Sequence, residues 1–161
     1  MRTWQRGPRG EFDAVVFRTD YSDTLGWIDV VGNLRRPWGP DGEIPASPLY
    51  LVDDGDWEGA SSADVFEAVA DEEDLTVVFL ADEQTFASAE RPLLAVTTLG
   101  PDDLDDEDYA DLAEFGTEFR VPAAHVCEVN SNLATGNMDF EKFAAAAADA
   151  ADGYFRGFDQ S

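Results

Sequence analysis

The stretch AVVFRTD at residues 14–20 decides the fold class, because it is a short run of β-branched and aromatic residues that ends in an aspartate. Two later stretches have the same form: LYLVDD at residues 49–54 and LTVVFLAD at residues 75–82. Nearly continuous apolar runs of this length are typical of strands that are buried on both faces of a sheet. The three stretches therefore predict a core of buried strands.

Helical patterns separate these three strands. Ser22 or Asp23 can cap a first helix, whose inward face would carry apolar residues at helical spacing: Trp27, Val30, Val31 and Leu34. Ser61-Ser62-Ala63-Asp64 is a capping-box pattern that predicts the start of a second helix. Right-handed crossovers make strands connected in this way parallel neighbours with helices packed on the sheet. The first half of the chain therefore predicts a β-α-β-α-β parallel core.

The second half extends this core. Residues 93–99 and 118–121 predict an antiparallel strand pair, and two C-terminal helices follow. The first of these helices runs through Val126, Val129 and Leu133, and the second begins at Asp139 as its N-cap. We expect one α/β domain over residues 12–158, with an arginine-containing arm at residues 1–11 and an aromatic C-terminal segment that docks on the core.

The composition limits the function. The 161 residues include 35 Asp and Glu against 10 Lys and Arg, a formal net charge of -25. A field of this sign disfavours direct binding to nucleic acid or an anionic membrane, and it favours basic proteins and cations. No apolar stretch is long enough to span a bilayer and no signal peptide is evident, so we expect a cytoplasmic protein. Adaptation to salt, or a genome that replaces Lys with Arg, would also explain the acidity.

An acidic insertion at residues 100–117 is the sharpest surface feature. Its centre carries carboxylates and no cation: Asp102, Asp103, Asp105, Asp106, Glu107, Asp108, Asp111 and Glu114. The spacing of Tyr109, Leu112 and Ala113 predicts a short helix. Such a helix would present a row of carboxylates to a basic partner, as inhibitors of nucleases and mimics of DNA do. A solvated loop explains the same charges, and charge runs are usually of that kind.

Three strand-end aspartates, Asp20, Asp53 and Asp82, form a second candidate site. Ligands of open parallel sheets bind beyond the carboxyl ends of the strands. Carboxylates that converge there could hold Mg²⁺ for phosphoryl-transfer or phosphodiester chemistry. The alternative is that these aspartates are helix N-caps, which strand-to-helix loops commonly contain.

A third candidate is the polar cluster of Asn130, Asn132 and Asn137, which could bind a small ligand through its amides or simply form a helix-helix turn. His125 and Cys127 are the remaining reactive pair. Residues two apart on a helix do not face each other, so catalysis by this pair is not expected. We expect Cys127 to be a buried apolar group and His125 to lie at the surface.

Seven short strings together carry a resemblance: FRTDYSD (17–23), VFLAD (78–82), PLLAV (92–96), FRVP (119–122), NSNL (130–133), NMDF (137–140) and FRGF (155–158). In this order they resemble a family of small acidic domains of unknown function found mainly in actinomycete genomes. The resemblance spans residues 12–158 and implies a single cytosolic domain, but no activity. The insertion at residues 100–117 is longer and more acidic than the connection typical of that family, which implies that a function common to the family lies elsewhere.

These observations predict a non-enzymatic acidic binding protein of the immunity or inhibitor type, without a cofactor. Its contacts to a basic protein would come from six residues of the insertion: Asp102, Asp103, Asp105, Asp106, Glu107 and Asp108. The alternatives are a Mg²⁺-dependent enzyme that uses the strand-end aspartates, and a small-ligand sensor that uses the asparagine cluster. The N-terminal arm, with Trp4 among three arginines, suggests weak self-association.

Overall fold

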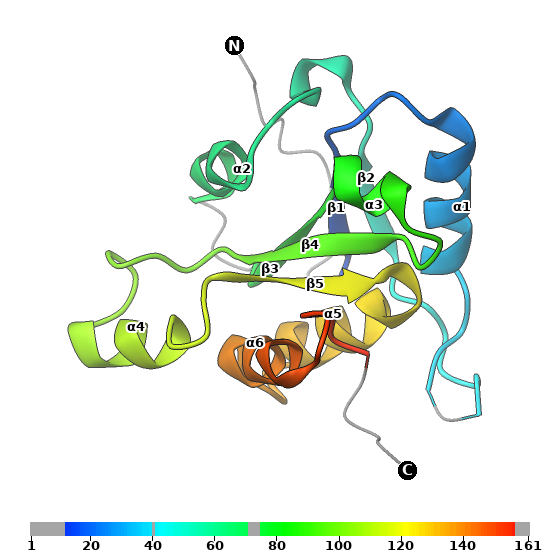
Figure 1. Cartoon of the computed structure of the whole chain (residues 1–161). Helices are drawn as coiled ribbons and strands as arrows, with labels where there is room; N and C mark the ends of the chain where they lie inside the picture. The colour runs from blue at the N-terminus through cyan, green and yellow to red at the C-terminus, as the bar shows by residue number, and fades with distance from the viewer. Residues whose placement is uncertain (1–11, 40, 71–74, 157–161) are drawn as a thin grey trace.

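Five strands form one mixed sheet in the order β2-β1-β3-β4-β5 (Figure 1). The computed structural model describes residues 12–39, 41–70 and 75–156. The strands are β1 (Ala14–Arg18), β2 (Leu49–Val52), β3 (Val77–Ala81), β4 (Pro92–Thr97) and β5 (Glu118–Pro122). β1 is parallel to β2 and β3, whereas β4 is antiparallel to both β3 and β5. The predicted α/β class, with a parallel core extended by an antiparallel pair, is confirmed.

The order of the strands differs from the prediction in one respect. β1 lies between β2 and β3, so β2 and β3 are not neighbours. The chain passes from β1 to the neighbouring strand β2 in one direction along the sheet, and from β2 past β1 to β3 in the opposite direction. Right-handed crossovers in opposite directions place their helices on opposite faces of a sheet. The residues of β1 alternate between the two cores that result: Val16 packs in one, and Val15 and Phe17 pack in the other. All five residues of β1 are buried.

Helices cover both faces of this sheet (Figure 1). They are α1 (Thr24–Leu34), α2 (Ser62–Val69), α3 (Glu83–Ala87), α4 (Asp106–Leu112), α5 (Val126–Ala134) and α6 (Phe140–Asp149), with short 3-10 turns η1 (Gly55–Trp57) and η2 (Ala123–His125). Apolar residues of α1, α5 and α6 pack in the larger core on one face. α2 and η1 pack in the smaller core on the other face.

Capping residues close in sequence mark where the helices begin, and two of the helix starts differ from the prediction. Asp23 caps α1 by accepting a hydrogen bond from the Gly26 amide at 2.8 Å, and the capping box before α2 forms as predicted. Asp139 directly precedes α6, but its side chain makes no capping hydrogen bond. The short helix α3 was not predicted, although the Asp82 and Thr85 side chains form a capping box at its start.

The C-terminal segment docks on the core as predicted. Phe155 is buried, with its ring centroid 5.0 Å from that of Phe143 in α6, and Tyr154 forms a bridge with Arg120 of β5. Residues 157–158 of this segment and the whole arm at residues 1–11 lie outside the described residues. Over the described ranges, no helix has the length and apolar character that crossing a membrane requires.

Candidate functional site

The candidate sites lie at two opposite edges of the sheet. β1, β2 and β3 are parallel, so Asp20, Asp53 and Asp82, which follow them, lie at one edge. β4 runs antiparallel to β3, so its last residue lies at the other edge, where the acidic insertion leads through α4 to β5. Figure 1 shows α3 and α4 at opposite ends of the strands accordingly.

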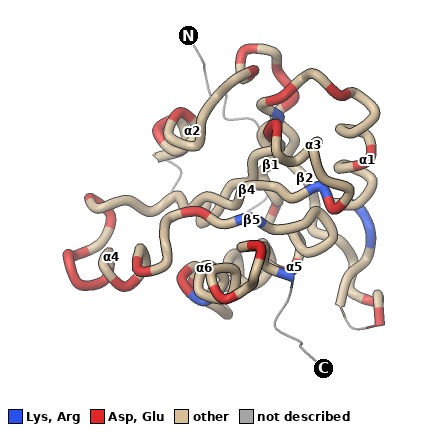
Figure 2. Tube along the Cα trace, in the orientation of Figure 1, with Lys and Arg blue, Asp and Glu red and all other residues tan. Residues whose placement is uncertain are grey.

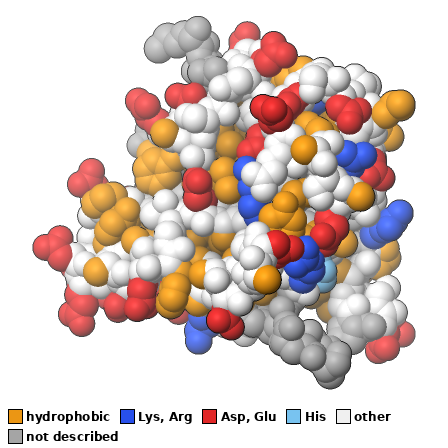
Figure 3. Space-filling view, in the orientation of Figure 1, with side chains coloured by type: hydrophobic (Ala, Val, Ile, Leu, Met, Phe, Trp, Pro, Cys, Tyr) orange, Lys and Arg blue, Asp and Glu red, His pale blue; other side chains and the backbone are white. Residues whose placement is uncertain are grey.

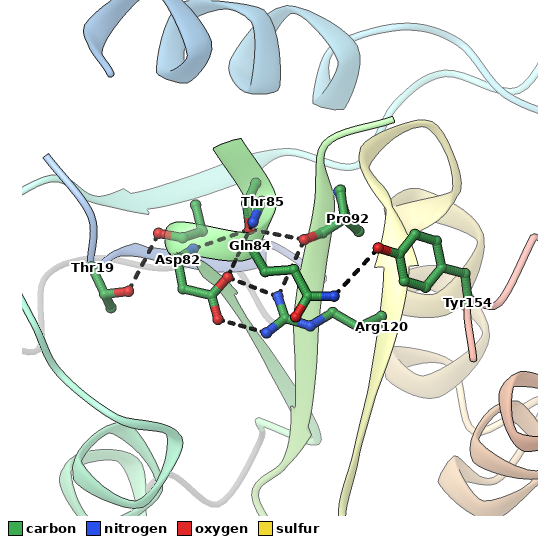
Figure 4. A network of polar contacts seen from close by, with 8 residues as sticks. Thr19, Asp82, Gln84, Thr85, Pro92, Arg120 and Tyr154 are labelled. Atoms are coloured by element: carbon green, nitrogen blue, oxygen red, sulfur yellow. Dashed lines mark hydrogen bonds and ion pairs between the residues drawn. The ribbon is translucent and has the colours of Figure 1, made fainter. Parts of the chain in front are cut away.

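Asp82 is the centre of a polar network at the first edge (Figure 4). The guanidinium of Arg120 binds its carboxylate in a bidentate manner, with Nη1–Oδ1 at 2.8 Å and Nη2–Oδ2 at 2.7 Å. The Thr85 amide donates a further hydrogen bond to Oδ1 at 3.2 Å. Both side chains of the ion pair are largely buried, with exposed fractions of 26% for Asp82 and 17% for Arg120. Bidentate pairs of this kind are among the stronger charge-assisted hydrogen bonds.

The network ties several elements together. The Thr85 hydroxyl donates to the carbonyl of Pro92 at 2.8 Å, which joins α3 to the start of β4. The Gln84 amide donates to the Tyr154 hydroxyl at 3.3 Å, which joins α3 to the C-terminal segment. Burial of Asp82 raises its pKa, but the hydrogen bonds and charge of Arg120, together with Thr85, outweigh burial and hold the pKa below its ordinary value. The Asp82 carboxylate is therefore ionised and already bound by protein donors.

The other two strand-end aspartates have different partners. Asp20 accepts a hydrogen bond from the Ser22 amide at 2.8 Å. Asp53 lies 3.4 Å from Nη1 of Arg18, a side chain whose guanidinium also lies 4.3 Å from the centre of the Tyr21 ring. Within the described ranges, no group of three or more His, Cys, Asp or Glu side chains is arranged to hold a metal ion. The geometry therefore does not support the magnesium site.

α1 and α3 approach each other at the carboxyl ends of β1 and β3, where open parallel sheets bind ligands. A Cβ atom added at Gly26 of α1 would lie 2.6 Å from Oδ2 of the capping Asp23 and 2.8 Å from Cδ1 of Phe86 in α3. The two helices therefore approach each other across this end of the sheet, and only glycine permits this distance. We interpret this edge as a structural junction.

The predicted asparagine cluster separates into two parts. Asn130 is buried, and its amide donates to the carbonyl of Phe12 at 3.0 Å, where the chain enters β1. Asn132 and Asn137 lie together at the end of α5, with Nδ2 of Asn137 donating to Oδ1 of Asn132 at 2.7 Å. Nδ2 of Asn132 donates to the Glu128 carbonyl. Asn132 and Asn137 therefore stabilise the end of α5, which agrees with the turn interpretation, whereas Asn130 lies within α5 and binds the chain before β1, which was not predicted.

His125 and Cys127 contact different partners. Cys127 is buried as predicted, and its Sγ lies 3.5 Å from the carbonyl oxygen of Leu34. Nδ1 of His125 lies 3.8 Å from a carboxylate oxygen of Glu128, and about a third of the His125 side chain is exposed. No described contact joins the thiol to the imidazole.

The six predicted contact residues form what we call the acidic surface: Asp102, Asp103, Asp105, Asp106, Glu107 and Asp108. All six are exposed. Figure 2 shows acidic residues concentrated along the chain at α4, and Figure 3 shows acidic side chains at the surface in the same region. The predicted short helix is confirmed. It begins after Asp105, whose side chain accepts a hydrogen bond from the Asp108 amide at 2.8 Å.

The segment that carries the acidic surface is anchored to the core, and the described cations do not neutralise it. Leu112 of α4 is buried in the larger core, and Leu104 and Tyr109 pack against that core. Four of the described arginines form ion pairs elsewhere, namely Arg18, Arg91, Arg120 and Arg156. In the part of the chain that the structure describes, no ion pair involves the acidic surface. Acidic residues in the first turn also stabilise a helix through its dipole, which accounts for part of this placement.

Comparison with known proteins identifies a family but no activity. The model of a family described as a domain of unknown function, DUF6924, matches residues 13–158. No curated protein matches the chain. The resemblance of the sequence to a family of unknown function is therefore confirmed over almost the whole chain.

Proposed function

The chain belongs to the family of domains of unknown function DUF6924, and from the geometry of its sites we propose that it is a non-enzymatic binding protein whose acidic surface engages a basic protein. The observation that carries the proposal is the exposure of six carboxylates on one short segment that no described cation neutralises. Like charges this close repel one another, and a cationic partner removes that repulsion.

The anchoring of α4 supports a binding role. A side chain that is already held in place loses little conformational freedom when a partner binds, so less of the interaction energy is spent on ordering. Burial of Leu112 fixes α4 to the core, and the hydrogen bond from the Gly100 amide to Asp103 at 2.7 Å fixes the turn before it. The backbone that carries the carboxylates is therefore fixed, and the side chains of Asp103 and Asp105 are also held by hydrogen bonds.

An acidic array of this kind favours fast, salt-sensitive association with a basic surface. This behaviour suits an immunity or inhibitor module, which acts by covering the basic surface of another protein. The two alternatives have weaker geometric support. The strand-end aspartates of the enzyme alternative each contact a different residue of the chain itself. The asparagines of the sensor alternative form hydrogen bonds within the fold.

The proposal is tested by replacing the six residues of the acidic surface with Asn or Gln. Asn retains the capping ability of Asp. Relief of the repulsion between like charges opposes the loss of the helix-dipole interaction, so the variant should keep a melting temperature close to that of the wild type. A matched control variant neutralises six exposed carboxylates elsewhere: Asp41, Glu43, Asp54, Asp56, Glu67 and Glu83. Each variant changes the net charge from -25 to -19, so the two differ only in where charge is lost.

The wild type and both variants serve as baits in lysate of the native host at low salt, with elution by a salt gradient. We expect one stoichiometric basic protein on the wild type and the control variant, and its loss from the acidic-surface variant. Exposed ion pairs are worth ~0.2–1 kcal/mol each, so six of them should change the affinity by at least about tenfold. Equal capture by both variants would refute the proposed surface.

A further inference from the structure

A shallow, mainly apolar groove lies between α6 and the chain that follows α4. Its lining includes Phe115, which follows α4 and which we call the wall, and Ala145 and Ala148 of α6, which we call the floor. Met138, which precedes α6, also lines the groove. Phe115 is 45% exposed, which places it among the few large apolar side chains at the described surface. α4 and α6 are adjacent in Figure 1.

We propose that this groove receives an apolar side chain of the basic partner, from a segment in which Arg or Lys residues flank that side chain. This inference rests on the proposed function, and it names the kind of segment that the acidic surface recognises. The acidic surface would bind the flanking cations while the groove buries the apolar group.

Charge complementarity selects this occupant. The carboxylates of Asp111 and Glu114 are exposed on the chain that leads into Phe115, and Asp149 lies at the α6 side of the groove. A segment with an apolar group alone would leave these carboxylates without partners, and an acidic segment would be repelled by them. Lys142 is the one cation among the lining residues. Replacing it with a neutral residue should therefore strengthen the binding of a basic segment.

The shape of the floor agrees with this occupant. Alanine side chains project little from a helix, so another chain can approach the surface of α6 closely. Phe115 then covers one side of an inserted group. Interfaces commonly combine a central apolar anchor with a charged rim in this way.

Two peptide probes test the inference. One is oligolysine, which carries charge alone, and the other is a lysine-leucine peptide of equal charge with one apolar face. We expect the lysine-leucine peptide to bind the wild-type chain about tenfold more tightly, since burying one apolar side chain is worth on the order of tenfold or more in affinity. Binding is measured by isothermal titration calorimetry at low salt.

Two groove variants remove this difference in separate ways. Phe115→Ala deletes the wall, and Ala148→Gln occupies the floor with a longer, uncharged side chain at an exposed position. We expect each variant to bind both peptides with similar affinity, with the oligolysine affinity unchanged from wild type. Lys142→Gln should tighten binding of both peptides.

The outcomes separate the two proposals. If both peptides bind the wild type equally, or if the leucine advantage persists in both groove variants, the groove is not the site and the proposed function stands. If neither peptide binds in a salt-dependent manner, the proposed function fails and the groove inference fails with it.

Discussion

Replacing Asp82 with Asn separates a structural role of this carboxylate from a metal-binding one. Asn still caps α3, because Asn and Asp are about equally good N-caps. What the variant loses is the negative charge that the Arg120 guanidinium binds at 2.7 and 2.8 Å. The Arg120 side chain is only 17% exposed, so its charge is left largely out of water without a counter-ion. We therefore expect a loss of stability.

The magnitude follows from the burial of the pair. Removing one partner of a fully buried ion pair lowers the free energy of unfolding by ~3–5 kcal/mol, whereas an exposed pair contributes ~0–1 kcal/mol. With exposed fractions of 26% and 17%, this pair lies between these limits. We expect Asp82→Asn to lower the free energy of unfolding by about 2–3 kcal/mol, or roughly 4–12 °C in melting temperature for a chain of this length. The matched control Asp20→Asn should change stability by less than about 0.5 kcal/mol.

The effect has a defined pH dependence. The pKa of Asp82 is lower in the folded chain than its ordinary value, so the stabilising effect is fully present above the unfolded pKa of about 4 and is lost as pH falls through the folded pKa. The stability difference between wild type and Asp82→Asn should therefore be constant near neutral pH and shrink below about pH 4. Urea unfolding followed by circular dichroism at several pH values measures this difference.

A double-mutant cycle supplies the decisive comparison. Arg120→Met removes the charge that Asp82→Asn leaves unpaired, so the double variant should be less destabilised than the sum of the two single variants. Additive losses, or an Asp82→Asn variant as stable as wild type, would refute the structural assignment of this edge.

Two further predictions concern the same end of the sheet. Gly26→Ala should destabilise the chain by about 1–3 kcal/mol in denaturant unfolding, because the added Cβ would lie 2.6 Å from Oδ2 of Asp23 and 2.8 Å from Cδ1 of Phe86. Combining it with Phe86→Leu should cost less than the sum of the two single losses. Additive losses in the double variant would argue against a close contact between Gly26 and Phe86. Burial, and then the charge of Asp53, raise the pKa of Tyr21 to about 12. A spectrophotometric titration of the four tyrosines should show one step near pH 12 that Tyr21→Phe removes, and titration of all four near pH 10 would contradict this assignment.

The fold was largely predictable because its signals are local. The strands are short apolar runs, and the capping residues before α1 and α2 lie within a few residues of the helices that they start. The start of α3 had a local signal as well, since Asp82 and Thr85 are three residues apart. The central position of β1 had no local signal, because strand order depends on the direction in which each crossover passes.

The sites were less predictable, because their partners are distant in sequence. Arg120 is 38 residues from Asp82, and Arg18 is 35 residues from Asp53. A pattern of strand-end aspartates cannot show that arginines bind two of them. The acidic surface was predictable as far as its charge and its short helix, since both arise within one segment. Its proximity to α6 and the resulting groove depend on the tertiary fold.

Titration of oligolysine onto three proteins tests the central claim most directly: the wild type, the acidic-surface variant and the matched control variant of equal net charge. We predict that the wild type and the control variant bind with similar affinity, and that the acidic-surface variant binds at least about tenfold more weakly. Added salt should weaken the binding of oligolysine to the wild type and to the control variant, and it should reduce the difference in affinity between these two proteins and the acidic-surface variant. Equal weakening of both variants would contradict the account, because it would show that the probe responds to total charge and not to the acidic surface.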